Sequence, residues 1–211
     1  MTKRLNELFS LIKSCDLFAD VGCDHGFISQ MVLDFGKAKK VIISDVSKKS
    51  LQKAEHLLKD YGNRVQSFVS DGFNGYDQIP DQAIIAGMGG EEIIKILQAS
   101  KFLPNRLILN PMKNADKVRK FLITNGYEIL KDYTILDGKF YDLILCEKGE
   151  DKYTDLEYIF GRDNLKSRPK DFIEKLKFYK KFYQDAIDKG GKDQDLTIKL
   201  SQIKGVLNED N

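Results

Sequence analysis

The stretch Phe18-Ala19-Asp20-Val21-Gly22-Cys23-Asp24-His25-Gly26 decides the fold of this chain. An apolar run, Leu17–Val21, leads into a turn that contains glycine, and a helical pattern begins at Phe27. Gly22 has no Cβ, so the chain there can adopt unusual dihedrals and come close to a ligand. The alternative is that Gly22 only makes the strand-to-helix turn. Either reading predicts a strand, a tight turn and a helix, which is the first half of a βαβ unit.

The rest of the first 125 residues repeats this alternation. Short apolar runs predict strands at Leu17–Val21, Lys40–Ser44, Val65–Val69, Gln82–Ala86 and Arg106–Asn110. Amphipathic patterns between them predict helices at Phe27–Phe35, Lys48–Tyr61, Glu91–Ala99 and Ala115–Thr124, and another precedes them at Lys3–Lys13. Apolar strands separated by longer helices indicate a parallel sheet.

The alternation of predicted strands and helices ends after residue 125. Tyr127–Leu136 and Phe140–Glu147 are strand-like, and Asp137-Gly138-Lys139 between them is a strong hairpin signal. We therefore expect an α/β fold over residues 1–149: a Rossmann-like, mostly parallel sheet with an antiparallel edge hairpin. This plan resembles the class I methyltransferase fold, whose last strand is antiparallel.

Residues 150–211 have a different composition and are expected to form a separate helical domain. The segment up to Arg168 is polar and irregular, and Pro169 can occupy the first turn of a helix. Two apolar seams follow, separated by Gly190-Gly191: Phe172, Leu176, Tyr179, Tyr183 and Ala186, then Leu196, Leu200, Ile203 and Leu207. Seams of this spacing predict an antiparallel, coiled-coil-like helical hairpin. The seams could pair within one chain or between two, and we expect a monomer.

Bulk properties limit the class of protein. The chain has 211 residues, 42% hydrophobic residues and a formal net charge of +2, which is typical of a globular protein. No apolar run is long enough for a membrane-spanning helix and no signal pattern begins the chain, so we expect a cytoplasmic protein that does not enter a membrane. Cys15, Cys23 and Cys146 form no CxxC pair, and only His25 and His56 accompany them, so no metal site is expected.

The first turn favours one kind of cofactor. Its pattern, D-x-G-x-D-x-G, differs from the G-x-G-x-x-G that seats a pyrophosphate at a helix N-terminus. This difference favours the sulfonium cofactor S-adenosylmethionine over a dinucleotide. Asp20 would meet the ammonium group of that cofactor, directly or through water, and Asp24 could add a second carboxylate. Gly22 would let the backbone approach it.

The next strand ends extend this cofactor site. Asp45, followed by Val46, lies where ribose hydroxyls are held in such folds, and Asp71, followed by Gly72, could accept the adenine amino hydrogen. Each carboxylate could instead be a helix cap or a turn residue. The glycine-rich run Gly87-Met88-Gly89 implies close backbone approach to the methyl donor or the acceptor, or else a flexible turn.

The fifth strand ends in Asn110-Pro111, followed by Met112 and Lys113. The pair looks like a shortened relative of the Asn-Pro-Pro-aromatic motif of adenine and glutamine N-methyltransferases. An asparagine side chain can bond the edge of an adenine. The second proline and the aromatic residue are absent, so this motif alone does not choose the methyl acceptor.

Together these motifs resemble the bacterial tRNA (adenine-N1)-methyltransferase family that modifies position 22. The matching pieces are Lys3-Arg4-Leu5, Asp20-Val-Gly-Cys-Asp-His25, Ser70-Asp-Gly72, Ile85-Ala-Gly-Met-Gly-Gly90, Asn110-Pro111 with Arg119, and Tyr141-Asp-Leu-Ile-Leu. The family usually has Gln-Pro-Asn where this chain has Asn110-Pro111-Met112, and Glu in place of Asp45. The match extends more weakly to Phe160-Gly161 and the C-terminal helices.

The resemblance implies methyl transfer from S-adenosylmethionine to N1 of an adenine in tRNA. The candidates for holding the base are Asn110 and the backbone around Gly87–Gly89, and Asp24 or His25 could touch it or assist in losing the amino proton; His25 could equally be a structural partner of the first turn. Candidate tRNA contacts are Arg4, Lys113, Arg119, Lys177, Lys180 and Lys181. The basic run Arg162–Lys181 could instead be a solvated helix face.

Two other functions compete with this one. The first keeps the cofactor and changes the acceptor to a protein glutamine, a DNA adenine or a small molecule. The second is a non-catalytic binding protein that uses the fold and the helices as an interaction surface. Cofactor binding separates the binding protein from the two enzymes, and methyl transfer to tRNA separates the enzymes from each other.

Overall fold

The computed structural model describes residues 2–189 and 194–208. Its centre is one seven-stranded sheet in the order β3-β2-β1-β4-β5-β7-β6. The strands are β1 Cys15–Val21, β2 Ala38–Asp45, β3 Val65–Val69, β4 Gln82–Met88, β5 Arg106–Pro111, β6 Tyr127–Asp137 and β7 Lys139–Lys148. β1 to β5 are parallel, and β7 is antiparallel to both β5 and β6. This arrangement confirms the expected Rossmann-like sheet with an antiparallel edge hairpin.

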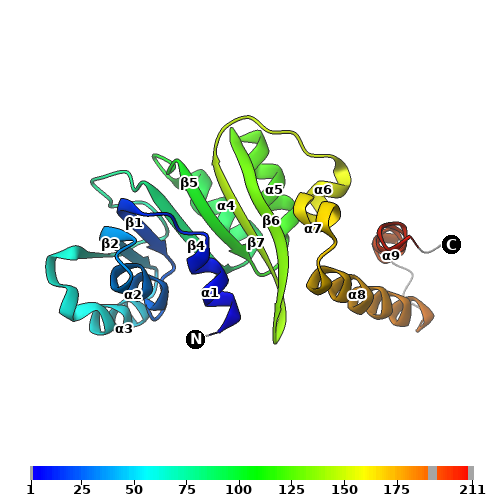
Figure 1. Cartoon of the computed structure of the whole chain (residues 1–211), viewed down its shortest axis with the longest axis horizontal. Coiled ribbons are helices and arrows are strands. Elements are labelled where there is room, and N and C mark those ends of the chain that lie inside the picture. Colours follow the sequence, from blue (N-terminus) through cyan, green and yellow to red (C-terminus); the bar gives the residue numbers. More distant parts are fainter. Residues whose placement is uncertain (1, 190–193, 209–211) are drawn as a thin grey trace.

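Helices cover both faces of the sheet because each buried strand carries apolar side chains on both sides (Figure 1). In Figure 1, α1 Lys3–Ser10, α2 Phe27–Asp34 and α3 Lys48–Leu58 lie in front of the sheet, and α4 Gly90–Ala99 and α5 Ala115–Thr124 lie behind it. Neighbouring strand residues accordingly enter different clusters: Ile43 packs with the front helices and Ile42 with the rear ones.

Most predicted elements fall within a few residues of the observed ones, and two differ for identifiable reasons. The third helix was expected to reach Tyr61 but ends at Leu58, and a 3₁₀ segment, Lys59–Arg64, follows. Gly62 in that segment has a φ of 56°, which an α-helix cannot continue through. The first helix likewise ends at Ser10, where Leu11 and Ile12 turn back with 3₁₀-type bonds to Leu8 and Phe9.

The expectation of an irregular segment before Arg168 was wrong. Two short helices lie there, α6 Asp155–Phe160 and α7 Arg162–Ser167. Thr154 and Glu157 form a reciprocal capping box at the start of α6. Helices of six residues are too short to show an apolar period, so only this cap could have signalled them.

Two longer helices, α8 Lys170–Asp188 and α9 Gln194–Leu207, complete the chain. They share an apolar cluster that includes Phe172, Leu176 and Ile203, so the two predicted seams do pack together. Figure 1 shows α9 nearly end-on where α8 runs across the view, so the helices cross and do not run antiparallel. The predicted Gly190-Gly191 turn lies outside the described residues.

Candidate active site

Two adjoining cavities lie at the carboxyl ends of the parallel strands, where open α/β sheets bind their ligands. Gly22 and Met88 belong to both. The first, here called the β2–β3 cavity, is lined by Val21, Asp45, Val46, Ser70, Asp71, Gly72, Glu92, Lys95, Ile96 and Ala99. The second, here called the α1–α2 cavity, is lined by Arg4, Leu5, Leu8, Asp20, Cys23, Asp24, His25, Phe27, Ile28, Ile84, Ala86 and Gly87. The site is therefore elongated and divided at its middle.

Asp20 is a buried carboxylate that faces the α1–α2 cavity. The Ser29 hydroxyl donates to its Oδ2 at 2.7 Å. Burial raises the pKa of Asp20 to about 6, although the Ser29 hydrogen bonds oppose the rise and Asp45 adds to it. Such a group is costly to keep ionised without a cationic partner, and a ligand ammonium would supply one.

Gly22 forms the boundary between the cavities. Its φ is +70°, and a Cβ placed there would come within 1.9 Å of Met88 Cε. Its N–H donates to the Ser44 carbonyl at 2.8 Å, which fixes the turn against β2. Any residue other than glycine would be strained at this φ and would occupy the narrowest part of the site.

The Asp45 carboxylate links the end of β2 to the turn that carries Asp24. Its Oδ2 accepts the Asp24 N–H at 3.2 Å and its Oδ1 accepts the Ser47 N–H at 2.8 Å. Asp24 itself has a φ of 46°, a conformation in which aspartate is tolerated better than most residues. Val46 is exposed beside Asp45 and lines the same β2–β3 cavity. The carboxylate is therefore positioned by two backbone donors at the cavity wall.

Asp71 and Gly72 contribute the end of β3 to this cavity. Asp71 Oδ1 accepts from Asn74 Nδ2 at 3.1 Å. Gly72 has a φ of 151°, and a Cβ there would lie 2.8 Å from Ile96 Cγ2. The glycine thus lets the loop pack directly against α4, whose Ile96 supplies an apolar wall.

An aromatic pair borders the α1–α2 cavity. The rings of His25 and Phe27 stack at 5.6 Å with an interplanar angle of 3°. His25 Nδ1 lies 2.7 Å from Asp24 Oδ2, and Lys53 Nζ lies 3.4 Å from His25 Nε2. Phe27 is 49% exposed although it begins a helix whose next residues are buried. The pair offers a flat apolar surface beside two polar groups.

Sequence reasoning missed Phe27, as well as Glu92, Lys95 and Ile96 of the β2–β3 cavity. Glu92, Lys95 and Ile96 belong to an ordinary amphipathic helical pattern, so their sequence context gave no sign of this placement. Phe27 could have been recognised by its position directly after the Asp24-His25-Gly26 turn. The other three enter the site only because Gly72 packs against α4.

The glycine run at the end of β4 divides in the structure. Gly87, with a φ of 83°, and Met88 line the α1–α2 cavity, whereas Gly89 is the N-cap of α4 and lines neither cavity. A Cβ on Gly89 would lie 3.1 Å from Lys113 Cε, which places the exposed Lys113 side chain beside this turn. Arg4 lines the α1–α2 cavity, and its guanidinium carbon is 5.1 Å from the Tyr141 ring centroid. Both cations therefore lie close to the strand ends.

Asn110 is buried and lines neither cavity. Its Nδ2 donates to the Asp142 carbonyl at 2.9 Å, and its Oδ1 has no hydrogen-bond partner among the described residues. The expectation that Asn110 touches the acceptor base is therefore not met in this conformation. Asn110 pairs with Ala86 of β4, and the bond to Asp142 holds its side chain against β7.

The expectation that Arg119 contacts tRNA was wrong. Arg119 is 1% exposed, and its Nε donates to both carboxylate oxygens of Asp132, at 3.0 and 2.8 Å. Its Nη1 donates to the carbonyls of Tyr158 and Ile159 in α6. The residue lies on the inner face of α5, where a charge must be paired, and it joins α6 to the sheet.

Two further charges join α8 to the sheet. Lys175 Nζ donates to both carboxylate oxygens of Asp142 at 2.7 Å. Burial opposes ionisation of Asp142, but Lys175 and Arg119 hold its pKa below the usual range. Asp171 Oδ2 accepts from Lys3 Nζ at 2.6 Å and from the Leu136 N–H at 2.8 Å. The start of α8 is therefore fixed to the hairpin and to α1.

The predicted lysines of α8 do not lie at either cavity. Lys177, Lys180 and Lys181 border a shallow surface depression on α8 together with Gln184 and Asp185. Lys177 and Lys181 are exposed. They belong to a second surface of the molecule.

Across residues 2–189 and 194–208, no three His, Cys, Asp or Glu side chains gather as they would around a metal ion. In the same residues, no helix combines the length and apolar character that a membrane crossing requires.

A family model described as a methyltransferase domain matches residues 1–144. A protein of Mycoplasma genitalium named as a tRNA methyltransferase is 31% identical over 154 residues, which are 70% of this chain and 70% of the relative. The tRNA (adenine(22)-N1)-methyltransferase of Bacillus subtilis is 30% identical over 159 residues, 71% of this chain and 66% of the relative. A crystal structure from Streptococcus pneumoniae, described as a tRNA (m1A22) methyltransferase in complex with S-adenosyl-L-methionine, superposes with a TM-score of 0.89 at 26% identity, covering 98% of this chain and 99% of the other.

The fold and the divided site already define an α/β protein of the methyltransferase class. The chain belongs to the methyltransferase-domain family and, within it, to the tRNA (adenine(22)-N1)-methyltransferase family.

Proposed function

We propose that the protein transfers a methyl group from S-adenosylmethionine to N1 of the adenine at position 22 of tRNA. The observation that carries this proposal is the divided site at the strand ends. The buried carboxylate of Asp20 lies on one side of Gly22, and the carboxylates of Asp45 and Asp71 lie on the other, where they would face the ribose and the adenine of the cofactor. The relative from Bacillus subtilis, whose name states this reaction, supports the acceptor.

The residues of the two cavities fit the cofactor. The β2–β3 cavity would hold the adenosine half, with Asp45 accepting from the ribose hydroxyls and Asp71 from the adenine amino group. Asp20 would hold the ammonium group, which relieves the cost of its buried charge. Gly22, which has no Cβ, leaves room for the Met88 side chain at the boundary between the two cavities. When bound, the cofactor supplies an electrophilic methyl group on a sulfonium sulfur.

The α1–α2 cavity would receive the acceptor base. Adenine N1 carries an in-plane lone pair and is unprotonated at neutral pH, so the site needs no strong base before attack. Its tasks are to hold the base, align N1 and exclude water. The stacked His25 and Phe27 provide an aromatic face for the base, and the Gly87 backbone leaves room for its edge. Asp24, hydrogen-bonded to His25, is placed to accept a proton from the amino group after transfer.

A cationic surface would hold the tRNA backbone. Arg4 and Lys113 lie close to the strand ends, and Lys177, Lys180 and Lys181 would extend the surface along α8. Phosphate contacts by such residues supply sequence-independent affinity that falls with salt. Part of the same proposal is a division at residue 149, with the following helices as the second, tRNA-holding unit. A monomer in the cytoplasm, where tRNA is found, completes it.

The test is transfer of labelled methyl from S-adenosylmethionine to unmodified tRNA transcripts, followed by mass spectrometry of the nucleosides. N1-methyladenosine in the tRNA is the expected product. A glutamine-containing peptide and an adenine-containing DNA oligonucleotide serve as competing acceptors. Cofactor binding with label only in the peptide or the DNA would show that the methyl acceptor is a protein or DNA and not tRNA. No cofactor binding at all would favour a non-catalytic binding protein.

A further inference from the structure

The exposed aromatic side chains of α8 have no role in the methyltransferase site. Phe178 is 57% exposed and Phe182 is 56% exposed, although the neighbouring Leu176 is buried in the α8–α9 cluster. Large apolar side chains exposed in adjacent turns of one helix mark a binding surface more often than a solvated face. The two lie four residues apart, so they share one face of the helix.

This face is the one that α8 turns toward the methyltransferase domain. Asp171 accepts from the Leu136 N–H, Lys175 pairs with Asp142, and the Phe178 ring lies 5.9 Å from the Phe140 ring. Asp171, Lys175 and Phe178 are separated by four and then three residues, and Phe182 follows Phe178 by another four. Phe182 therefore lies on the same face, one turn beyond the hairpin residues that α8 contacts.

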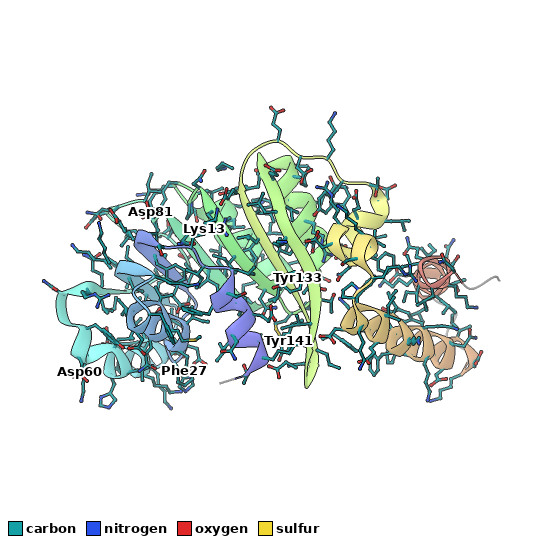
Figure 2. The ribbon with its side chains drawn as sticks, viewed as in Figure 1. Lys13, Phe27, Asp60, Asp81, Tyr133 and Tyr141 are labelled. Atoms are coloured by element: carbon teal, nitrogen blue, oxygen red, sulfur yellow. The ribbon has the colours of Figure 1, made fainter. Side chains whose placement is uncertain are left out.

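This face of α8 also begins beside the end of β5, which lies next to the methyltransferase site. Asp142, the partner of Lys175, accepts from Asn110 at the end of β5 through its backbone carbonyl. Arg4 of the α1–α2 cavity and Lys139 of the hairpin tip both approach the Tyr141 ring, at 5.1 and 5.8 Å. Figure 2 labels Phe27 and Tyr141, which lie along one edge of the molecule on either side of α1. A long substrate that enters the α1–α2 cavity can thus continue over the hairpin tip to α8.

The positive charge around the two phenylalanines indicates which kind of partner binds them. Lys177 and Lys181 are exposed and each directly precedes one of the two phenylalanines, and Lys139 is exposed beside Phe140. A second copy of the chain would bring the same lysines against these lysines. A polyanion with flat apolar groups satisfies both features, because phosphates pair with lysines and unpaired bases stack on aromatic rings.

We propose that Phe178 and Phe182 form a stacking surface for unpaired nucleobases of the tRNA, with Lys177 and Lys181 on the adjoining phosphates. The inference rests on the proposed function and adds to it that α8 reads loop nucleotides, whose bases are free to stack. Paired regions offer no free base face at this surface. The α8 face therefore discriminates folded tRNA, with its exposed loop bases, from duplex RNA of equal charge.

The chain contains no tryptophan, so a single introduced tryptophan reports on stacking without interference. Phe182→Trp places this reporter in the proposed surface. Phe35→Trp is the matched control, since Phe35 is 69% exposed at the far end of α2, away from the strand ends. Unmodified tRNA should quench the fluorescence at position 182 and leave that at position 35 unchanged. Heparin, a polyanion without bases, and a fully paired RNA duplex should quench neither.

A functional series completes the test. Replacing both phenylalanines by leucine should raise the KM for tRNA about tenfold, as expected for the loss of base stacking, with the affinity for S-adenosylmethionine unchanged. Replacement of both by tyrosine should restore the KM, since the ring is kept. An unquenched tryptophan at position 182 in a tRNA-bound protein, or an unchanged KM in the leucine variant, would overturn the inference.

The outcome for the wild-type chain keeps the two proposals apart. If the wild-type chain does not methylate tRNA, the proposed function fails. If it methylates tRNA and the leucine variant does so with the same KM, only the stacking surface fails. A wild-type dimer in sedimentation that the leucine variant dissociates would assign the two phenylalanines to a second copy instead and would also overturn the inference.

Discussion

Replacing Asp20 by asparagine should make the protein more stable and a weaker binder of S-adenosylmethionine. The carboxylate is buried, the Ser29 hydroxyl donates to it, and the negative charge of Asp45 opposes its ionisation. Asparagine keeps an oxygen that can accept from the Ser29 hydroxyl and removes the buried charge. The structure therefore predicts opposite effects on the free energy of unfolding and on ligand affinity.

The size of the stability change follows from the pKa. Burial raises the pKa of Asp20 from 3.8 to about 6, a difference of about two units, which corresponds to about 3 kcal/mol. Below the unfolded value both states are protonated and ionisation costs nothing. As the pH rises from about 4 to about 6, the unfolded chain ionises first and the wild type loses stability. The full cost is present above about pH 6 and is absent from the variant.

The assay is thermal unfolding of both proteins without ligand, at pH 5 and pH 7.5. At pH 7.5 the variant should melt about 6–12 °C higher, and at pH 5 about half of that advantage should remain. Calorimetry at pH 7.5 should show S-adenosylmethionine binding about ten- to a hundredfold more weakly, since a hydrogen-bonded charge contact is lost. Asp77→Asn, an amide for an exposed carboxylate, should change neither quantity.

A variant that melts at or below the wild type at pH 7.5 would show that the buried charge of Asp20 does not destabilise the protein. So would an advantage of equal size at the two pH values, since it could not come from ionisation of Asp20. Unchanged ligand affinity would remove Asp20 from the ammonium position and leave the stability argument intact.

Three further predictions concern two residues of the site and the buried Arg119. Gly22→Ala should lose about 1–2 kcal/mol in urea unfolding because of its positive φ, and should bind S-adenosylmethionine more weakly in calorimetry, because the new Cβ displaces the Met88 side chain that lines both cavities; normal affinity would contradict this. Arg119→Met should lose about 3–5 kcal/mol in urea unfolding by leaving Asp132 unpaired, whereas weakened tRNA binding at full stability would restore the surface role. Phe27→Ala should lower kcat/KM for tRNA about tenfold or more with cofactor affinity unchanged, and a loss confined to cofactor affinity would exclude it from the acceptor side.

Sequence reasoning predicted the fold well because its signals were local. The alternation of apolar strands and amphipathic helices, and the Asp137-Gly138-Lys139 turn, each specify one element and its neighbour. The crossing of α8 and α9 was missed because an apolar seam shows that two helices pack but leaves their crossing angle open. The capped helix α6 was missed because six residues are too few to repeat the helical period.

The candidate site was predicted in part for the same reason. Asp20, Gly22, Asp45 and Asp71 end strands, and parallel strands bring their carboxyl ends to one edge, so position in the sequence was enough. Arg119 looks like a surface arginine of an amphipathic helix, and its burial depends on pairing with Asp132 of another element. Phe27 is exposed beside the α1–α2 cavity, and the buried Asn110 side chain is bonded to Asp142 of β7. Such properties depend on contacts between segments far apart in the chain.

The most direct measurement compares two transcripts of one tRNA that differ only at position 22, one with adenine and one with guanine. After reaction with S-adenosylmethionine and the protein, primer extension locates any methyl group on the Watson–Crick edge, and mass spectrometry identifies the nucleoside. If the protein methylates N1 of adenine 22, the first transcript gains one N1-methyladenosine at position 22 and the second gains none. Equal methylation of both transcripts, or none in either by a protein that binds the cofactor, would contradict this activity.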